Sequence, residues 1–104
     1  MERIGFCMRL LPGAEAEYRE RHRHVWPELL SDLRAAGATN YSIFIRGSDL
    51  FAYLEVEDFA RFTDQMGHSE ANERWQAEMA SLIDPLTDPA TGFHQRLEPV
   101  FRME

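Results

Sequence analysis

The sequence predicts an α+β fold in which a small antiparallel sheet is combined with helices. Segments with the apolar pattern of strands occur near the beginning, the middle and the end of the chain. Segments with the three- and four-residue spacing of helices lie between them, and proline, glycine and aspartate separate the two kinds. The length of 104 residues suits one domain, which we expect to span residues 1–104.

In the first half of the chain the pattern predicts a strand, two helices and a second strand. Residues 3–11 are apolar with few interruptions and are followed by a Pro-Gly turn. Polar residues at helical spacing then lead to Trp26-Pro27, where the proline breaks the first helix and starts a second one. Leu29, Leu30 and Leu33 form the expected buried stripe of that helix, which ends at Gly37. Residues 39–46 alternate as a strand.

The second half predicts a hairpin, a helical region and a last strand. A Gly-Ser-Asp turn leads from the second strand into residues 50–56. Asp58 can cap a helix through Met66, and a further helix runs to about Ile83. Residues 95–102, which contain Pro99, then alternate as an edge strand. The predicted order is therefore βαββαβ.

This order matches the ferredoxin-like unit, in which the first and third strands lie in the middle of a four-stranded antiparallel sheet. Residues 4–11 and 50–56 are apolar on both faces, so both faces of the sheet need cover. The helices can cover only one of them. We therefore expect a homodimer of the dimeric α+β barrel type, in which a second copy covers the other face.

Composition excludes several classes of function. The chain is 44% hydrophobic and 28% charged, as in an ordinary globular protein. Its net charge of −7, without a basic cluster, argues against nucleic acid as a partner. Its apolar runs are too short for a membrane span, and Glu2 and Arg3 stand where a secretion signal would be apolar, so we expect a cytoplasmic protein. The single cysteine, Cys7, is expected to be buried in a strand.

Tyr18 and His22 are the first candidates for chemistry. They lie four residues apart on the predicted helix and therefore project from one face. A histidine exchanges protons near neutral pH and can act as a general acid or base. The alternative is a surface histidine on a solvated helix. A metal site is not expected, because His22 and His24 would point in nearly opposite directions and His68 and His94 lack a nearby ligand pattern.

Trp75, Gln76 and Tyr41 are candidates for binding a sugar. A flat indole ring can lie on the C–H face of a pyranose while amides and phenols bond its hydroxyl groups. Each aromatic residue could equally belong to the core. No glycine-rich phosphate loop, serine nucleophile elbow or Cys–His pairing is present.

The segment from Tyr18 to Leu29, YRERHRHVWPEL, resembles the signature of the L-rhamnose mutarotase family. That signature has a tyrosine, a histidine four residues on, and a Trp-Pro-Glu-Leu run at this spacing. Further similarity lies in residues 37–43 (GATNYSI), in Arg74-Trp75 and in residues 98–101 (EPVF), so the resemblance covers nearly the whole chain.

The resemblance implies a ferredoxin-like dimer that interconverts the α and β pyranose anomers of L-rhamnose without metal or coenzyme. By position it implies that His22 is the proton donor, that Tyr18 and Tyr41 contact the sugar through their phenols, and that Trp75 forms the aromatic floor. The family pattern has two adjacent tryptophans, whereas the second position here is Gln76, which exchanges an apolar contact for an amide. The preferred sugar could therefore be L-rhamnose or a related 6-deoxy sugar.

Two other functions are compatible with this fold. One is a haem-degrading or quinol monooxygenase built on the same dimeric barrel, with His22 as a haem ligand. The other is a non-catalytic sugar-binding or sensing module in which His22 only hydrogen-bonds the ligand. Neither explains the Trp-Pro-Glu run at its spacing from Tyr18 and His22.

Overall fold

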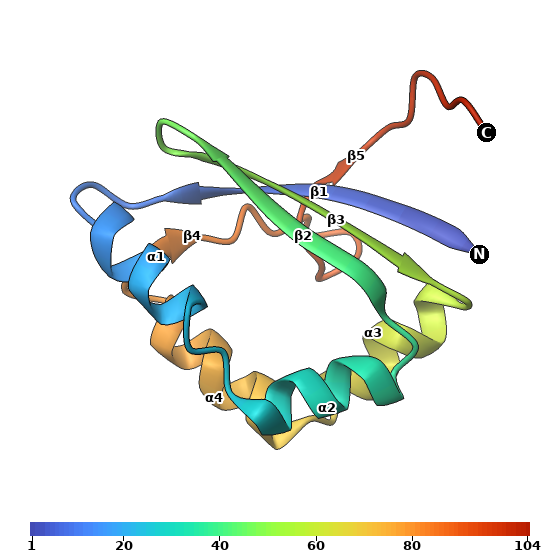
Figure 1. The fold of residues 1–104 in the computed structure, drawn as a ribbon, viewed down its shortest axis with the longest axis horizontal. Coiled ribbons are helices and arrows are strands. Elements are labelled where there is room, and N and C mark those ends of the chain that lie inside the picture. Colours follow the sequence, from blue (N-terminus) through green and yellow to red (C-terminus); the bar gives the residue numbers. More distant parts are fainter.

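The computed structural model describes residues 1–104. All four helices lie on one side of the sheet, and the C-terminal tail leaves on the opposite side (Figure 1). The elements follow the expected βαββαβ order with the expected two helices at each helical position, except that the last strand position holds two short strands. They are β1 (Glu2–Leu10), α1 (Glu15–His22), α2 (Pro27–Ala35), β2 (Thr39–Arg46), β3 (Asp49–Val56), α3 (Phe59–Gly67), α4 (Glu70–Met79), β4 (Ile83–Asp84) and β5 (Arg96–Leu97).

The sheet has the order β2-β3-β1-β4, and all its pairs are antiparallel. β5 pairs with β1 further along the edge that β4 occupies. β1 and β3 are the two central strands, as the sequence predicts. The expected α+β, ferredoxin-like class is confirmed.

The core lies between the sheet and the helices. Alternate side chains of β1 and β3 point toward the helices and are buried, whereas those between them are half-buried or exposed. This is the two-residue period of a strand with one covered face. The buried set comprises Ile4, Phe6, Met8, Leu10, Leu50, Ala52, Leu54 and Val56.

Three expectations about individual segments are wrong. α4 ends at Met79 and Ile83 already belongs to β4, so the helix is shorter than expected. The strand expected over residues 95–102 is reduced to β5, because Pro99 has no amide hydrogen and nothing in the chain pairs with the segment after Leu97. Cys7 is half-buried instead of buried, because odd-numbered positions of β1 face away from the helices.

An irregularity at the start of β2 determines where Tyr41 points. The register between β2 and β3 shifts between Thr39 and Ser42, and Asn40 has a positive φ of 50°. Such a bulge redirects the side chains that follow it. Tyr41 then lies on the same side of the strand as Ile43, with which it lines a hollow facing the helices.

Ser69 fixes the beginning of α4. Its hydroxyl accepts a hydrogen bond from the backbone N–H of Asn72 at 3.0 Å and donates one to the carboxylate of Asp32 on α2 at 2.6 Å. One side chain thus caps α4 and ties it to α2. None of the helices has the length and apolar character needed to cross a membrane.

We expect Ser69→Ala to lower the free energy of unfolding by about 1–2 kcal/mol, because it removes a helix cap and leaves Asp32 without its partner. Urea denaturation followed by circular dichroism measures the change. The control is Ser81→Ala, since the Ser81 hydroxyl only donates to the carbonyl of Glu78 at 3.3 Å. Equal losses in the two variants would contradict the role assigned to Ser69.

Candidate active site

His22 is the last residue of α1, and its ring folds back along the helix. Its Nδ1 lies 2.8 Å from the backbone carbonyl oxygen of Tyr18. A carbonyl oxygen can only accept, so Nδ1 carries a proton and donates it. In the neutral ring the lone pair is therefore on Nε2, and in the charged ring Nε2 carries the second proton. Nε2 is the atom available to a ligand in either state.

Tyr18 lies directly beneath His22. The centroids of the two rings are 4.1 Å apart with 33° between their planes, and only 5% of Tyr18 is exposed. Burial raises the pKa of the Tyr18 phenol to about 12, so the hydroxyl stays protonated near neutral pH. Tyr18 thus supports His22 in two ways, through its ring and through its backbone carbonyl.

One tryptophan contacts His22, and a second tryptophan contacts the first. The ring of Trp75, on α4, meets His22 edge to face at a centroid distance of 5.4 Å. Trp26 meets Trp75 in the same way at 5.2 Å, and the guanidinium of Arg74 lies 5.5 Å from the centre of the Trp26 ring. These contacts have the edge-to-face geometry that aromatic rings prefer. They restrict the orientation of the His22 imidazole.

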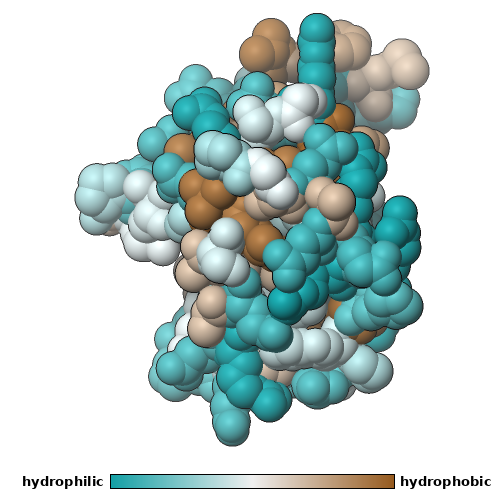
Figure 2. Space-filling view, turned by 90° about the vertical axis from the view of Figure 1, so that its left-hand side faces the viewer, coloured by the Kyte–Doolittle hydropathy of each residue, from teal (hydrophilic) through white to brown (hydrophobic).

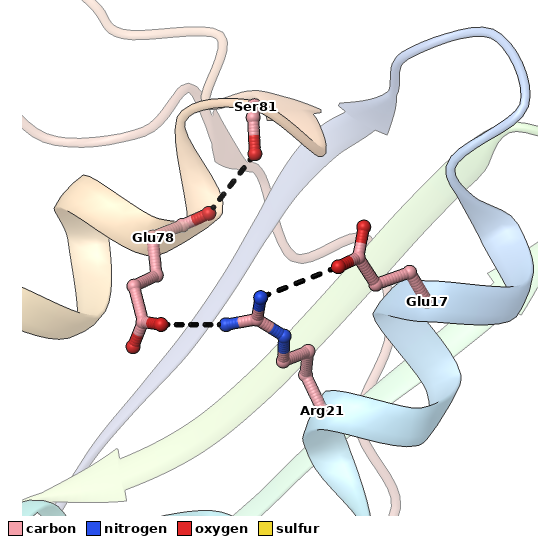
Figure 3. Close-up of polar contacts among 4 residues, drawn as sticks. All are labelled: Glu17, Arg21, Glu78 and Ser81. Atoms are coloured by element: carbon pink, nitrogen blue, oxygen red, sulfur yellow. Dashed lines mark hydrogen bonds and ion pairs between the residues drawn. The ribbon is translucent and has the colours of Figure 1, made fainter.

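An ion pair joins the two helices that carry these residues. Figure 3 shows Arg21 reaching from α1 to Glu78 of α4, with Nη1 and Oε1 2.8 Å apart, while Nη2 lies 3.2 Å from Glu17. Arg21 precedes His22 in the sequence, and Glu78 is one helical turn after Trp75. The ion pair therefore connects α1 and α4 close to the contact between His22 and Trp75.

A hollow of about 640 Å³ opens beside these rings between α2, α4 and β2. We call it the His22 cavity. It brings together four of the five residues expected from the sequence, namely His22, Tyr41, Trp75 and Gln76. Tyr18 is not among its lining residues, because it lies behind His22. Leu30 and Leu33 line it as well, which explains why they are half-buried and not buried as expected.

Tyr41 lines the cavity with 39% of its surface exposed. Burial raises the pKa of this phenol, and the nearby Tyr18 adds to the shift in the same direction. The hydroxyl is therefore neutral and can donate a hydrogen bond. The phenol that bonds within the chain is that of Tyr53, to Glu55 at 2.7 Å, so the hydroxyl groups of Tyr18 and Tyr41 have no partner within the chain, and of these two residues Tyr41 lines the His22 cavity.

Gln76 lines the His22 cavity, and its amide nitrogen already makes a hydrogen bond within the chain. Its Nε2 donates to the side-chain oxygen of Asn72 at 3.2 Å, and the Asn72 amide in turn donates to the carbonyl of Met66 at 3.3 Å. This relay fixes the Gln76 amide and leaves its oxygen free to accept. Sequence analysis missed Asn72, although its position four residues before Gln76 on one helix was a usable signal.

Burial lowers the pKa of His22 below its usual value of 6.5, and the hydrogen bond to the Tyr18 carbonyl opposes that shift. The neutral ring therefore predominates at pH 7. A group of this kind can pass a proton at Nε2 to or from an oxygen held in the cavity.

Comparison with known proteins identifies the family of the chain. The family model described as L-rhamnose mutarotase matches residues 3–103. The chain belongs to the L-rhamnose mutarotase family. The family resemblance expected from the sequence is confirmed.

Relatives in this family share much of the sequence. An L-rhamnose mutarotase from Burkholderia orbicola is 42% identical over the full length of both chains, and one from Listeria monocytogenes is 44% identical over 80% of this chain and 81% of its own. The crystal structure of an L-rhamnose mutarotase from Formosa agariphila, 34% identical, superposes over both whole chains with a TM-score of 0.81.

In this member of the mutarotase family, we expect His22 to titrate with a midpoint below pH 6.5, because burial disfavours its charged form. NMR of the imidazole carbons gives the midpoint, and ¹⁵N shifts of the neutral ring should show the proton on Nδ1. The spectrum of His22→Ala assigns the signals. A midpoint at or above 6.5, or a neutral ring protonated on Nε2, would contradict the geometry.

Proposed function

We propose that this chain interconverts the α and β pyranose anomers of L-rhamnose, with His22 as the proton donor. Membership in the L-rhamnose mutarotase family supports both the substrate and the reaction. The reaction is that of an isomerase. The observation that carries the role of His22 is its fixed ring, whose Nε2 is the one nitrogen free to meet a sugar in the His22 cavity.

The reaction needs proton transfers and no other chemistry. The ring oxygen gains a proton, the anomeric hydroxyl loses one, the open-chain aldehyde carbon rotates, and the ring closes on its other face. His22 in its imidazolium form would donate from Nε2 to the ring oxygen. A phenol or a water molecule would complete the second transfer.

The other cavity residues fit the binding of a pyranose. Trp75 offers a flat apolar surface at the cavity wall, and Tyr41 a hydroxyl that can donate. The oxygen of Gln76 can accept from a sugar hydroxyl, since its nitrogen is engaged by Asn72. Tyr18 acts in this proposal mainly by holding His22, while its hydroxyl has no partner in the chain.

We also propose that the protein is a homodimer. Side chains of the sheet face away from the helices with large exposed fractions, among them Phe44 at 64%, Phe51 and Leu97. Phe44 and Phe51 are register partners and so form one apolar surface. Hydrophobic surface gathers in the upper half of Figure 2, where the sheet and tail lie, whereas the helical half is mostly hydrophilic. Such a surface is suited to a second copy.

The C-terminal tail adds to this interface in the proposal. Val100, Phe101 and Met103 are each more than four-fifths exposed, and the tail extends from the side of the sheet that the helices leave open (Figure 1). In a dimer these side chains would lie against the partner's sheet.

We further propose that residues 1–104 act as one domain. We also propose that the protein is cytoplasmic, which cell fractionation would test.

The reaction and the donor are tested together by exchange NMR on equilibrated L-rhamnose. We expect the wild-type protein to accelerate α–β interconversion, and His22→Ala to lose roughly 10²-fold or more of the added rate. The control is His24→Ala, because His24 is an exposed neighbour that contacts Glu20 at 3.2 Å. No acceleration by the wild type would refute the proposed reaction. Full activity of His22→Ala would favour a role in binding only.

The dimer is tested by sedimentation equilibrium at micromolar concentration. We expect a mass of twice the 12.1 kDa of the chain. Phe44→Glu should shift the protein toward one chain, because a two-fold interface would bury the new charge twice. Ala60→Glu, an exposed position on α3, is the matched control. A wild-type mass of one chain at all concentrations would refute the proposal.

A further inference from the structure

A second hollow adjoins the His22 cavity. It has a volume of about 650 Å³, and its lining includes Phe6, Thr87 and His94, which lie on β1 and on the segment between β4 and β5. We call it the His94 cavity. The two cavities share one wall, made by Leu33, Tyr41, Asn72 and Gln76. A ligand in the His22 cavity that contacts these four residues therefore lies next to the His94 cavity.

His94 is held as firmly as His22. Its ring stacks on that of Phe6, with centroids 4.8 Å apart and 11° between the planes, and Phe93 meets it edge to face at 4.9 Å. Its Nδ1 lies 2.7 Å from the carbonyl oxygen of Pro85 and must donate to it. Nε2 is again the nitrogen left for a ligand. Burial lowers the pKa of His94, so near neutral pH this Nε2 is an acceptor.

The shared wall offers a second acceptor. Gln76 uses its nitrogen on Asn72, so its oxygen is free, and Gln76 lines both cavities. An alcohol hydroxyl has one proton to donate, and either the Gln76 oxygen or His94 Nε2 can accept it. An apolar wall would offer a hydroxyl no partner.

We propose that the His94 cavity receives a hydroxyl-bearing substituent of the sugar whose anomeric centre lies at His22, so that pyranoses with a hydroxyl on C6 are substrates besides the 6-deoxy sugar. This inference rests on the proposed function. C6 is attached to the carbon next to the ring oxygen, so a sugar that presents its ring oxygen to His22 carries C6 close to that end of the molecule. Gln76 and His94 determine this tolerance.

The sharpest probe is a pair of sugars that differ at this one position. L-mannose is L-rhamnose with a hydroxyl on C6. We expect exchange NMR to show that the wild-type protein accelerates the interconversion of both sets of anomers.

Variants of His94 separate its free nitrogen from its structural bond. His94→Asn can keep the bond to the Pro85 carbonyl but has no atom in place of Nε2. We expect it to lower the catalysed rate of L-mannose interconversion roughly three- to tenfold relative to that of L-rhamnose, which corresponds to the loss of one hydrogen bond. His94→Gln places an amide near the position of Nε2 and should retain most of the L-mannose rate.

The matched control is His68→Asn. His68 makes the same kind of bond, from Nδ1 to the carbonyl of Asp64 at 2.8 Å, but lines neither cavity. It should leave the rates of both sugars unchanged, and circular dichroism checks that every variant is folded.

The possible results are distinguishable. If the wild-type protein accelerates the interconversion of L-rhamnose anomers but not of L-mannose anomers, this inference is overturned and the proposed function stays intact. Equal losses on both sugars in His94→Asn would show a structural role and also overturn it. Acceleration of neither sugar by the wild type would overturn the proposed function and this inference with it.

Discussion

The burial of one face of the sheet is the constraint on which the rest of the structure depends. The side chains of β1 and β3 that point toward the helices are buried, and Ile4, Leu50 and Val56 have no exposed surface. This contact fixes the layer of helices against the central strands. It also leaves two regions open: the outer face of the sheet, and the space between β2 and the helices. The first suits a second copy of the chain, and the second forms the His22 cavity.

Short polar contacts then convert this packing into a defined site. Ser69 ties the start of α4 to α2, and Arg21 ties α1 to the later part of α4. The Tyr18 carbonyl holds one nitrogen of His22, and Trp75 limits how the ring can turn. The site therefore depends on rigid elements more than on loops, which suits a reaction that requires accurate placement of one proton.

Sequence periodicity was sufficient to predict the layers of the fold but not where each helix and strand ends. The alternation in β1 and β3 predicted the central strands, and Pro27 marked the start of α2, because both signals are local. The end of α4 and the shortness of β5 depend on which partner a segment finds, and a single sequence does not reveal this. His22 was found through its spacing from Tyr18 and a family signature. Asn72 was missed although its contact with Gln76 is local to α4. The cavity side of His94 depends on contacts between distant segments and was missed for that reason.

The central claim is that His22 delivers a proton from its charged form, and the pH dependence of the catalysed interconversion of L-rhamnose tests it most directly. Burial places the pKa of His22 below 6.5, and the donor is the form present below that pKa. After subtraction of the spontaneous rate, the account predicts that the catalysed rate rises as the pH falls through a midpoint below 6.5, and that this midpoint is absent in His22→Ala. A rate that instead rises with pH through the same midpoint would make neutral His22 a base and contradict its role as the donor.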